Sequence, residues 1–122
     1  MAEEIKNEFP DYTFNLFQMQ ALRTAKDMGP EGDLMHATLG LVSEAGEFAD
    51  AIKKSYAYDK ELDVENLIEE IGDIMWFCAL ACKSLGVPME QPALRCIEKL
   101  MKRYPDKYSN EAAHERADKQ AE

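Results

Sequence analysis

Apolar side chains recur at steps of three and four along most of the chain, which is the spacing of one face of an α-helix. Thr13 is a residue type that caps helix N-termini, and the apolar stripe that follows it is interrupted by Gly29 and Pro30. A second stripe begins near Asp33, another capping residue type, and is lost around residues 56–60. The pattern therefore predicts a first helix that starts at Thr13 and a second that starts near Asp33.

The same spacing continues in the second half of the sequence. Asp63 is the expected N-cap of a third helix, whose stripe runs to Leu85 and stops at the Gly-Val-Pro sequence of residues 86–88. A fourth helix is expected from about 89 to 103, with Pro105 closing it.

These elements predict an all-α fold, because no stretch alternates with period two over enough residues to make a strand. Four helices joined by short loops indicate an antiparallel four-helix bundle-like protomer. We expect one domain over residues 1–122, with a core of about 13–108 and a polar tail at 109–122 that is either a loosely held helix or disordered. A bundle this small has a thin core, so a dimer or a dimer of dimers is expected to bury the wider stripes.

A short internal repeat connects the second and third predicted helices. Residues 41–48 (LVSEAGEF) and 67–74 (LIEEIGDI) share the frame Leu, branched aliphatic, any, Glu, any, Gly, acid, apolar. At about 100° per residue, the acids of both segments fall on the shoulder of the apolar stripe. These acids are Glu44 and Glu47 in one segment, and Glu70 and Asp73 in the other. Antiparallel packing of the two helices would bring the four carboxylates to one edge of the pair.

Four further residues on these helices carry expectations about packing. Gly46 and Gly72 occupy matching places in the repeat, and since a mid-helix Gly costs about 1 kcal/mol against Ala, they suggest a close approach of the two helices. Trp76 falls on the side opposite Leu67, where a second subunit is expected to cover it. His36 falls away from the apolar stripe and is expected at the surface or at an interface.

The clustered acids indicate a metal site. Carboxylates brought together repel one another and lose hydration, so a counter-charge must offset that cost. Mg²⁺ and Mn²⁺ prefer oxygen ligands, and protein-bound Mg²⁺ usually keeps open positions that bind substrate phosphates. One acid pair alone is more often a solvated helix face. Two pairs in register, each with a glycine in register, favour the metal site.

Composition and charge exclude some classes of function. The 122 residues carry 14 Lys plus Arg and 24 Asp plus Glu, for a net charge of −10, which argues against a nucleic-acid binder. No apolar run approaches the roughly 18 residues of a membrane span, and the N-terminal residues are acidic, unlike a secretory signal. The odd number of cysteines favours a cytoplasmic protein with reduced thiols. Cys78 and Cys82 lie on the apolar stripe of the third helix, which favours a packing role in the core.

The acidic repeat resembles the signature of a known family. Glu-Ala-Gly-Glu at 44–47, then 22 residues, then Glu-Ile-Gly-Asp at 70–73 is similar to the E-x-x-E…E-x-x-D motif of the MazG-like nucleoside triphosphate pyrophosphohydrolases. The resemblance extends over roughly residues 13–108 and includes three flanking segments. These are the first helix with Phe17, Gln18, Ala21 and Thr24, the helix of residues 36–50, and the basic segment 99–105.

The resemblance implies an enzyme that hydrolyses (deoxy)nucleoside triphosphates to the monophosphate and pyrophosphate with Mg²⁺, or Mn²⁺ as a substitute, with nucleotide-pool cleansing as a role. It also implies a homodimer or homotetramer with active sites near the subunit interface. On this resemblance the metal ligands and catalytic residues are Glu44, Glu47, Glu70 and Asp73. One carboxylate, assigned here to Glu47, would double as the general base for the water that attacks the α-phosphorus.

Substrate contacts are implied in the same way. Lys99 and Arg103 are four residues apart on one predicted helix and would hold the β- and γ-phosphates, and Lys54 would do likewise. Gln18 and Phe17 would meet the base by a hydrogen bond and by stacking. The resemblance implies no base preference, because the family's substrate-selecting positions vary.

Two alternative functions belong to other classes of protein. A di-iron carboxylate bundle uses Glu-x-x-His on two helices, and neither His36 nor His114 follows a motif Glu by three. A non-enzymatic helical dimerisation or adaptor module, with an acidic face for basic peptides, is supported by the net charge alone. A specific cation site should raise the melting midpoint in Mg²⁺ or Mn²⁺, whereas an adaptor should respond only as it does to a monovalent salt.

Overall fold

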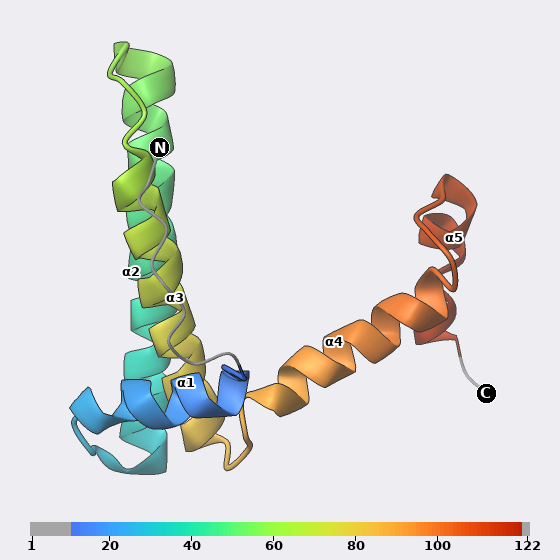
Figure 1. Ribbon diagram of the computed structural model, residues 1–122, viewed down its shortest axis with the longest axis horizontal. Coiled ribbons are helices and arrows are strands. Elements are labelled where there is room, and N and C mark those ends of the chain that lie inside the picture. Colours follow the sequence, from blue (N-terminus) through green and yellow to red (C-terminus); the bar gives the residue numbers. More distant parts are fainter. Residues whose placement is uncertain (1–10, 121–122) are drawn as a thin grey trace. The chain divides into compact units, whose positions relative to one another are not determined.

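A computed structural model describes residues 11–120 of the chain, and every regular element in that range is helical (Figure 1). The elements, in chain order, are α1 (Phe14–Ala21), η1 (Leu22–Thr24), α2 (Gly29–Tyr58), α3 (Val64–Ser84), α4 (Glu90–Arg103), α5 (Asn110–Glu115) and η2 (Ala117–Lys119). Residues 11–120 contain no strand, so the predicted all-α class is confirmed. None of these helices is both long and apolar enough for a transmembrane span.

The chain divides into two compact units, Met1–Met89 and Glu90–Glu122. The first contains α1, η1, α2 and α3, and the second contains α4, α5 and η2. The four-helix arrangement, the single domain and the oligomer stay predictions.

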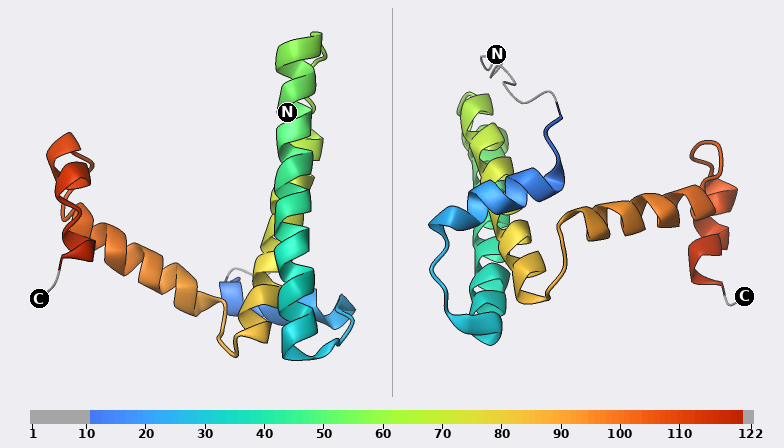
Figure 2. Two further views of the ribbon diagram at one scale, coloured as in Figure 1. Left: turned by 180° about the vertical axis from the view of Figure 1, so that it is seen from behind. Right: turned by 60° about the horizontal axis from the view of Figure 1, so that its bottom comes forward.

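The first unit is built on an antiparallel pair of helices. α2 and α3 run side by side in opposite directions, and α1 crosses the end of the pair where α2 begins and α3 ends (Figures 1 and 2). The short segment between Tyr58 and Val64 joins the pair at the other end, with Asp59 in the left-handed region at φ 53°. This pairing brings the two halves of the acidic repeat to the same interface.

The helix boundaries agree with the capping chemistry at two predicted positions. Thr13 accepts a hydrogen bond from the Leu16 N–H, and Asp63 accepts one from the Asn66 N–H, both at 3.1 Å, so both predicted N-caps are confirmed. Gly86, at φ 70°, follows the end of α3. The side chains of Thr13 and Asp63 satisfy N–H groups that the first helical turn leaves unpaired.

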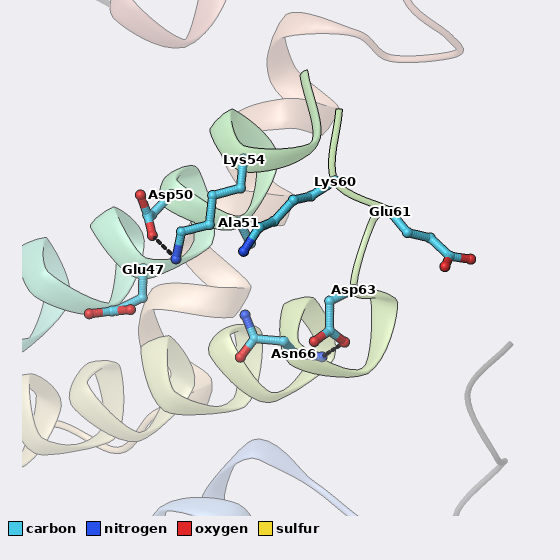
Figure 3. Close-up of a pocket in the computed structure, with 8 residues that line it drawn as sticks. All are labelled: Glu47, Asp50, Ala51, Lys54, Lys60, Glu61, Asp63 and Asn66. Atoms are coloured by element: carbon cyan, nitrogen blue, oxygen red, sulfur yellow. Dashed lines mark hydrogen bonds and ion pairs between the residues drawn. The ribbon is translucent and has the colours of Figure 1, made fainter. Parts of the chain in front are cut away.

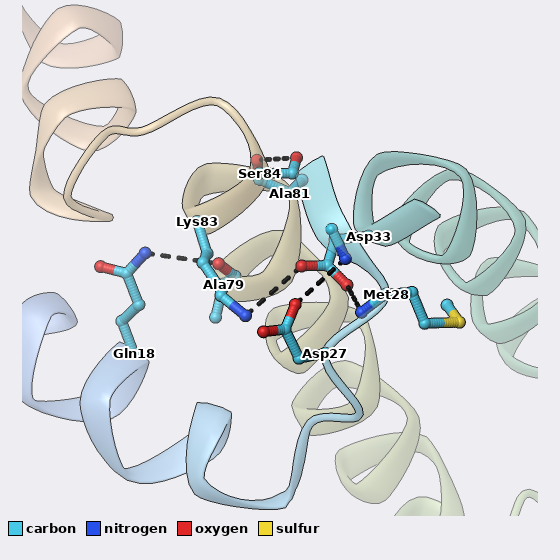
Figure 4. A network of polar contacts seen from close by, with 9 residues as sticks. Gln18, Asp27, Met28, Asp33, Ala79, Ala81, Lys83 and Ser84 are labelled. Carbon is cyan, nitrogen blue, oxygen red and sulfur yellow. Dashed lines mark hydrogen bonds and ion pairs between the residues drawn. The ribbon is translucent and has the colours of Figure 1, made fainter. Parts of the chain in front are cut away.

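The predicted start of the second helix at Asp33 is wrong. The helix begins at Gly29, with Pro30 in its first turn, where the missing N–H of proline costs no hydrogen bond. Asp33 lies inside the helix and is 2% exposed. Its carboxylate accepts the Met28 N–H at 3.1 Å and pairs with Lys83 at 3.3 Å, so it ties the start of α2 to the end of α3 (Figure 4).

The core of the first unit is small and lies under the α1 crossing. Ala79, Cys82 and Met89 form a buried cluster, and Phe17 packs against it from α1. Cys78 also packs on this cluster, and burial raises the pKa of both the Cys78 and Cys82 thiols, as expected for core residues. Several apolar side chains of the predicted stripes stay exposed in this single chain, namely Ile52 at 41%, Ile71 at 48% and Leu85 at 63%.

One packing prediction is wrong. Gly46 and Gly72 have open space where a Cβ would stand, whereas a Cβ on Gly40 would overlap the ring of Phe77. The glycine that permits close approach is therefore Gly40, because a bulky aromatic ring from α3 packs directly on it. Trp76 is half-buried in this chain, and its Nε1–H donates to the Ala21 carbonyl at 3.0 Å. Its cover by a second subunit stays a prediction.

The second unit holds the polar tail in helical form. The guanidinium of Arg103 at the end of α4 donates two hydrogen bonds to the Asp118 carboxylate, from Nε to Oδ1 at 2.7 Å and from Nη2 to Oδ2 at 3.1 Å. The Asp118 side chain is only 3% exposed, and its hydrogen bond with Arg103 lowers the pKa of Asp118. This pair fixes η2 against α4.

Candidate metal centre

Three of the four repeated acids converge between α2 and α3. Glu44 on α2 and Glu70 and Asp73 on α3 each place a carboxylate oxygen within 4.8 Å of the other two. The antiparallel pairing explains the convergence, because Glu44 and Glu70 occupy the same position of the repeat on helices that face each other.

The cluster is desolvated on one side and open on the other. Glu70 is 9% exposed and its Oε2 is buried with no hydrogen-bond partner in residues 11–120. Glu44 is half-buried, and Asp73 is exposed. A buried carboxylate oxygen without a partner is unfavourable unless a donor or a cation reaches it.

The electrostatics of the cluster also favour a proton or a cation among these carboxylates. The pKa of Glu70 is raised to about 7, first by a hydrogen bond with Glu44, then by burial, and then by the negative charges of Glu44, Asp73 and Glu47. The proton that Glu70 retains near neutral pH offsets part of the repulsion among these acids. A hard divalent cation can take over that role, and a set of carboxylate oxygens is the donor set that Mg²⁺ and Mn²⁺ prefer. Glu44, Glu70 and Asp73 therefore fit such an ion.

Glu47 lies beside this group. It lines a separate cavity of about 400 Å³ at the joined end of α2 and α3, together with Lys54, Lys60 and Asn66 (Figure 3). Its charge still contributes to the raised pKa of Glu70. The structure thus brings three of the predicted ligands together, and the ligand role of Glu47 stays a prediction.

Lys54 faces the same cavity as Glu47, as its spacing predicts. Its ammonium pairs with Asp50 at 2.8 Å, and this hydrogen bond raises the pKa of Lys54 and lowers that of Asp50 (Figure 3). Asp50 and Lys60 were not singled out from the sequence. Asp50 was detectable, since it stands four residues before Lys54 on one helix. Lys60 lies beyond the helix, where periodicity gives no signal.

Gln18 and Phe17 have packing roles in this chain. The Gln18 amide donates to the carbonyls of Ala79 and Val87 at 3.3 and 3.4 Å, and its oxygen accepts the Met89 N–H at 2.9 Å (Figure 4 shows the bond to Ala79). Phe17 packs against the core cluster. Contact between these two residues and a base stays a prediction.

Lys99 and Arg103 belong to α4 in the second unit. Lys99 is exposed, whereas Arg103 is half-buried and bonded to Asp118. Their role as phosphate ligands stays a prediction.

A second cavity, of about 370 Å³, adjoins the acidic cluster. Its lining consists of His36, Glu44, Asp73, Trp76 and Phe77. His36 is half-buried and lies edge-on to the rings of Trp76 and Phe77, with ring centroids 6.2 and 5.5 Å away. The sequence does not predict this arrangement, because a helical wheel places His36 on α2 without showing which rings of α3 reach it.

The fold and the cluster together define an all-α protein with a group of converging carboxylates between two antiparallel helices. The model of the MazG nucleotide pyrophosphohydrolase domain matches residues 34–108, and the chain belongs to this family. That range contains both acidic segments of the repeat.

One relative among known proteins is the Gene 37 protein of Mycobacterium phage L5. It is 39% identical over 75 residues, which cover 57% of this chain and 65% of the relative. The match therefore spans somewhat less than two thirds of the relative's length. No solved structure gives a significant match to the chain.

Proposed function

We propose that this protein hydrolyses nucleoside triphosphates to the monophosphate and pyrophosphate in the presence of Mg²⁺, and that it serves to cleanse the nucleotide pool. The observation that carries the proposal is the convergence of Glu44, Glu70 and Asp73, with a buried, unpartnered oxygen on Glu70. Membership of the MazG nucleotide pyrophosphohydrolase family supports it.

Glu44, Glu70 and Asp73 would hold Mg²⁺, and Mn²⁺ would substitute for it. When bound, the ion supplies charge neutralisation and polarisation at phosphoryl oxygens. Glu70 must give up its proton to become a ligand, and its pKa of about 7 makes that proton easy to release near neutral pH.

Glu47 is the proposed general base. It stands one turn beyond Glu44 on α2, outside the group of three carboxylates, and its oxygen can accept the proton of a water molecule. That water oxygen forms the new bond to the α-phosphorus. The bond from the α-phosphorus to the bridging oxygen breaks, and pyrophosphate leaves with the electron pair.

The cavity beside Glu47 is the proposed place of the β- and γ-phosphates. Lys54 and Lys60 line it and supply positive charge, and the Asn66 amide supplies a neutral donor (Figure 3). Lys99 and Arg103 of the second unit are further proposed phosphate ligands.

A second copy of the chain is proposed to cover the apolar surface of α2. Met35, Leu39 and Val42 are spaced by four and three residues and are 61%, 62% and 71% exposed. Such a stripe is typical of a helix–helix interface, which supports a homodimer or a dimer of dimers. The three cysteines are free thiols, consistent with the cytoplasmic location that we propose.

A product analysis tests the reaction. The protein is incubated with Mg²⁺ and a panel of ribo- and deoxyribonucleoside triphosphates, and the products are separated by anion-exchange chromatography. We expect monophosphate and pyrophosphate from wild type, and no turnover from Glu44→Gln or Asp73→Asn at unchanged helical content. Glu69→Gln, which alters an exposed acid next to the cluster, is the matched control and should retain activity. Diphosphate with orthophosphate as products would contradict the assignment.

A further inference from the structure

The aromatic cavity beside the acidic cluster has the chemistry of a site for a flat heterocycle. The rings of Trp76 and Phe77 lie 4.9 Å apart in an edge-on arrangement, and His36 completes a group of three rings. The cavity volume of about 370 Å³ lies within the range of roughly 300–1,000 Å³ that is typical of small-molecule sites. Glu44 and Asp73 also line it, so an occupant would lie directly beside the cluster.

His36 supplies the polar group of this cavity. Its Nδ1 is buried and has no hydrogen-bond partner in the described chain. A proton on a buried nitrogen without an acceptor is unfavourable, which favours Nε2 as the nitrogen that donates. Nε2 is not among the buried, unpartnered atoms, which leaves it as the donor that a ligand in the cavity can reach.

We propose that this cavity binds the base of the nucleotide substrate, with the base against Trp76 and Phe77 and with the His36 Nε2–H donating to an acceptor on the base edge. The inference rests on the proposed function, because it assumes that the triphosphate lies at the neighbouring carboxylates. A phosphate group is a poor occupant of the aromatic part of this cavity, since it would lose its hydration against the rings of Trp76 and Phe77.

This assignment differs from the one made on resemblance for Gln18 and Phe17. The Gln18 amide is already bonded to backbone groups at both its nitrogen and its oxygen, whereas His36 has a nitrogen to offer. The site therefore distinguishes nucleotides from phosphoanhydrides that have no base.

Trp76 makes the proposal testable without a variant, because it is the only tryptophan of the chain. Its fluorescence is recorded while an α,β-imido nucleoside triphosphate is titrated into the protein with Mg²⁺, and in parallel while inorganic triphosphate is titrated. We expect a saturable emission change with the nucleotide and none with triphosphate. The same change with both probes would overturn the proposal, and so would calorimetric binding of the nucleotide without any emission change.

Variants of the two histidines give a second readout. His36→Phe keeps a ring in place and removes the donor, so KM should rise about 3- to 10-fold while kcat stays within about twofold. His114→Phe, in the second unit, should leave both constants unchanged. An unchanged KM in His36→Phe would overturn the role of His36.

The outcomes separate this inference from the proposed function. If the protein hydrolyses nucleotides but neither the Trp76 emission nor the KM of His36→Phe responds, the base site is wrong and the enzyme assignment stands. If nucleotides are neither bound nor hydrolysed, the proposed function is wrong and the base site is wrong with it.

Discussion

Glu44 on α2 and Glu70 on α3 bring carboxylate oxygens within 4.8 Å of each other. The pKa of Glu70 rises to about 7, and the largest cause is a hydrogen bond between the two carboxyl groups. Two carboxyl groups can make such a bond only while one of them holds a proton. Around neutral pH the metal-free site therefore changes between a protonated pair and a fully ionised pair. A divalent cation and this proton compete for the same oxygens.

The first prediction concerns Mg²⁺ and pH. Because Glu70 must be ionised to bind the cation, Mg²⁺ should raise the melting temperature more at pH 8 than at pH 6. Melting followed by circular dichroism at matched ionic strength measures this difference. A shift no larger than that of sodium chloride at both pH values would contradict the cation site and favour the acidic adaptor.

Glu70 should also make the stability of the metal-free protein depend on pH, but here stability falls as the pH rises. The folded state binds the Glu70 proton more tightly than the unfolded state, whose pKa is near 4.5, so the free energy of unfolding should fall as pH rises from about 4.5 to about 7. Glu70→Gln removes the carboxyl group that ionises, so this variant should not lose stability over that pH range. The variant should be more stable than wild type in urea at pH 8 without metal, and it should lose the Mg²⁺ response.

Gly40 and Phe77 give a packing prediction. A Cβ at Gly40 would overlap the Phe77 ring, so Gly40→Ala should lower the free energy of unfolding by about 1–3 kcal/mol, measured by urea denaturation. Gly72→Ala is the matched control, because its Cβ would meet open space. That variant should be neutral or gain up to about 1 kcal/mol from helix propensity. Equal losses in both variants would show that the close contact is not at Gly40.

Asp33 gives a prediction about how the helix pair is held. Asp33→Ala removes both the acceptor for the Met28 N–H and the partner of Lys83, so it should lower the free energy of unfolding by about 1–3 kcal/mol. Asp33→Asn keeps an oxygen that can accept the Met28 N–H and should cost less. Chemical denaturation of the two variants checks this order, and equal losses would contradict the role given to the Met28 hydrogen bond.

Arg103 and Asp118 allow the predicted phosphate role of Arg103 to be separated from its packing role. If Arg103 binds substrate, Arg103→Ala should raise KM several-fold, whereas Asp118→Ala should leave KM unchanged or lower it because it frees the guanidinium. Both variants should lose stability, since each breaks the pair that fixes η2. Steady-state kinetics make the distinction, and unchanged KM in both variants would leave Arg103 with a packing role alone.

Much of the first unit could be predicted from the sequence, because its signals are local. Thr13 and Asp63 cap helices through hydrogen bonds to residues three positions away, and sequence spacing encodes such contacts. The meeting of Glu44 and Glu70 could also be predicted, since the repeat gives both helices the same frame and a short connection makes them antiparallel.

The other packing features depend on contacts between helices, which the sequence pattern of a single helix does not predict. The ring of Phe77 decides that Gly40, rather than Gly46, is the contact glycine. The Trp76 indole is bonded to Ala21 at the end of α1, a contact that the pattern of α3 alone does not show. The ring of His36 on α2 lies edge-on to Trp76 and Phe77 on α3, and the pattern of α2 alone does not predict these contacts.

The central claim is that the carboxylates of Glu44, Glu70 and Asp73 form one divalent cation site. Titration with Mn²⁺, with the free ion measured by electron paramagnetic resonance, tests it most directly. Wild type and the control Glu69→Gln should bind Mn²⁺ saturably, and Mg²⁺ should displace the bound ion, whereas Glu70→Gln and Asp73→Asn should lose this binding at unchanged helical content. Undiminished Mn²⁺ binding by those two variants would contradict the account.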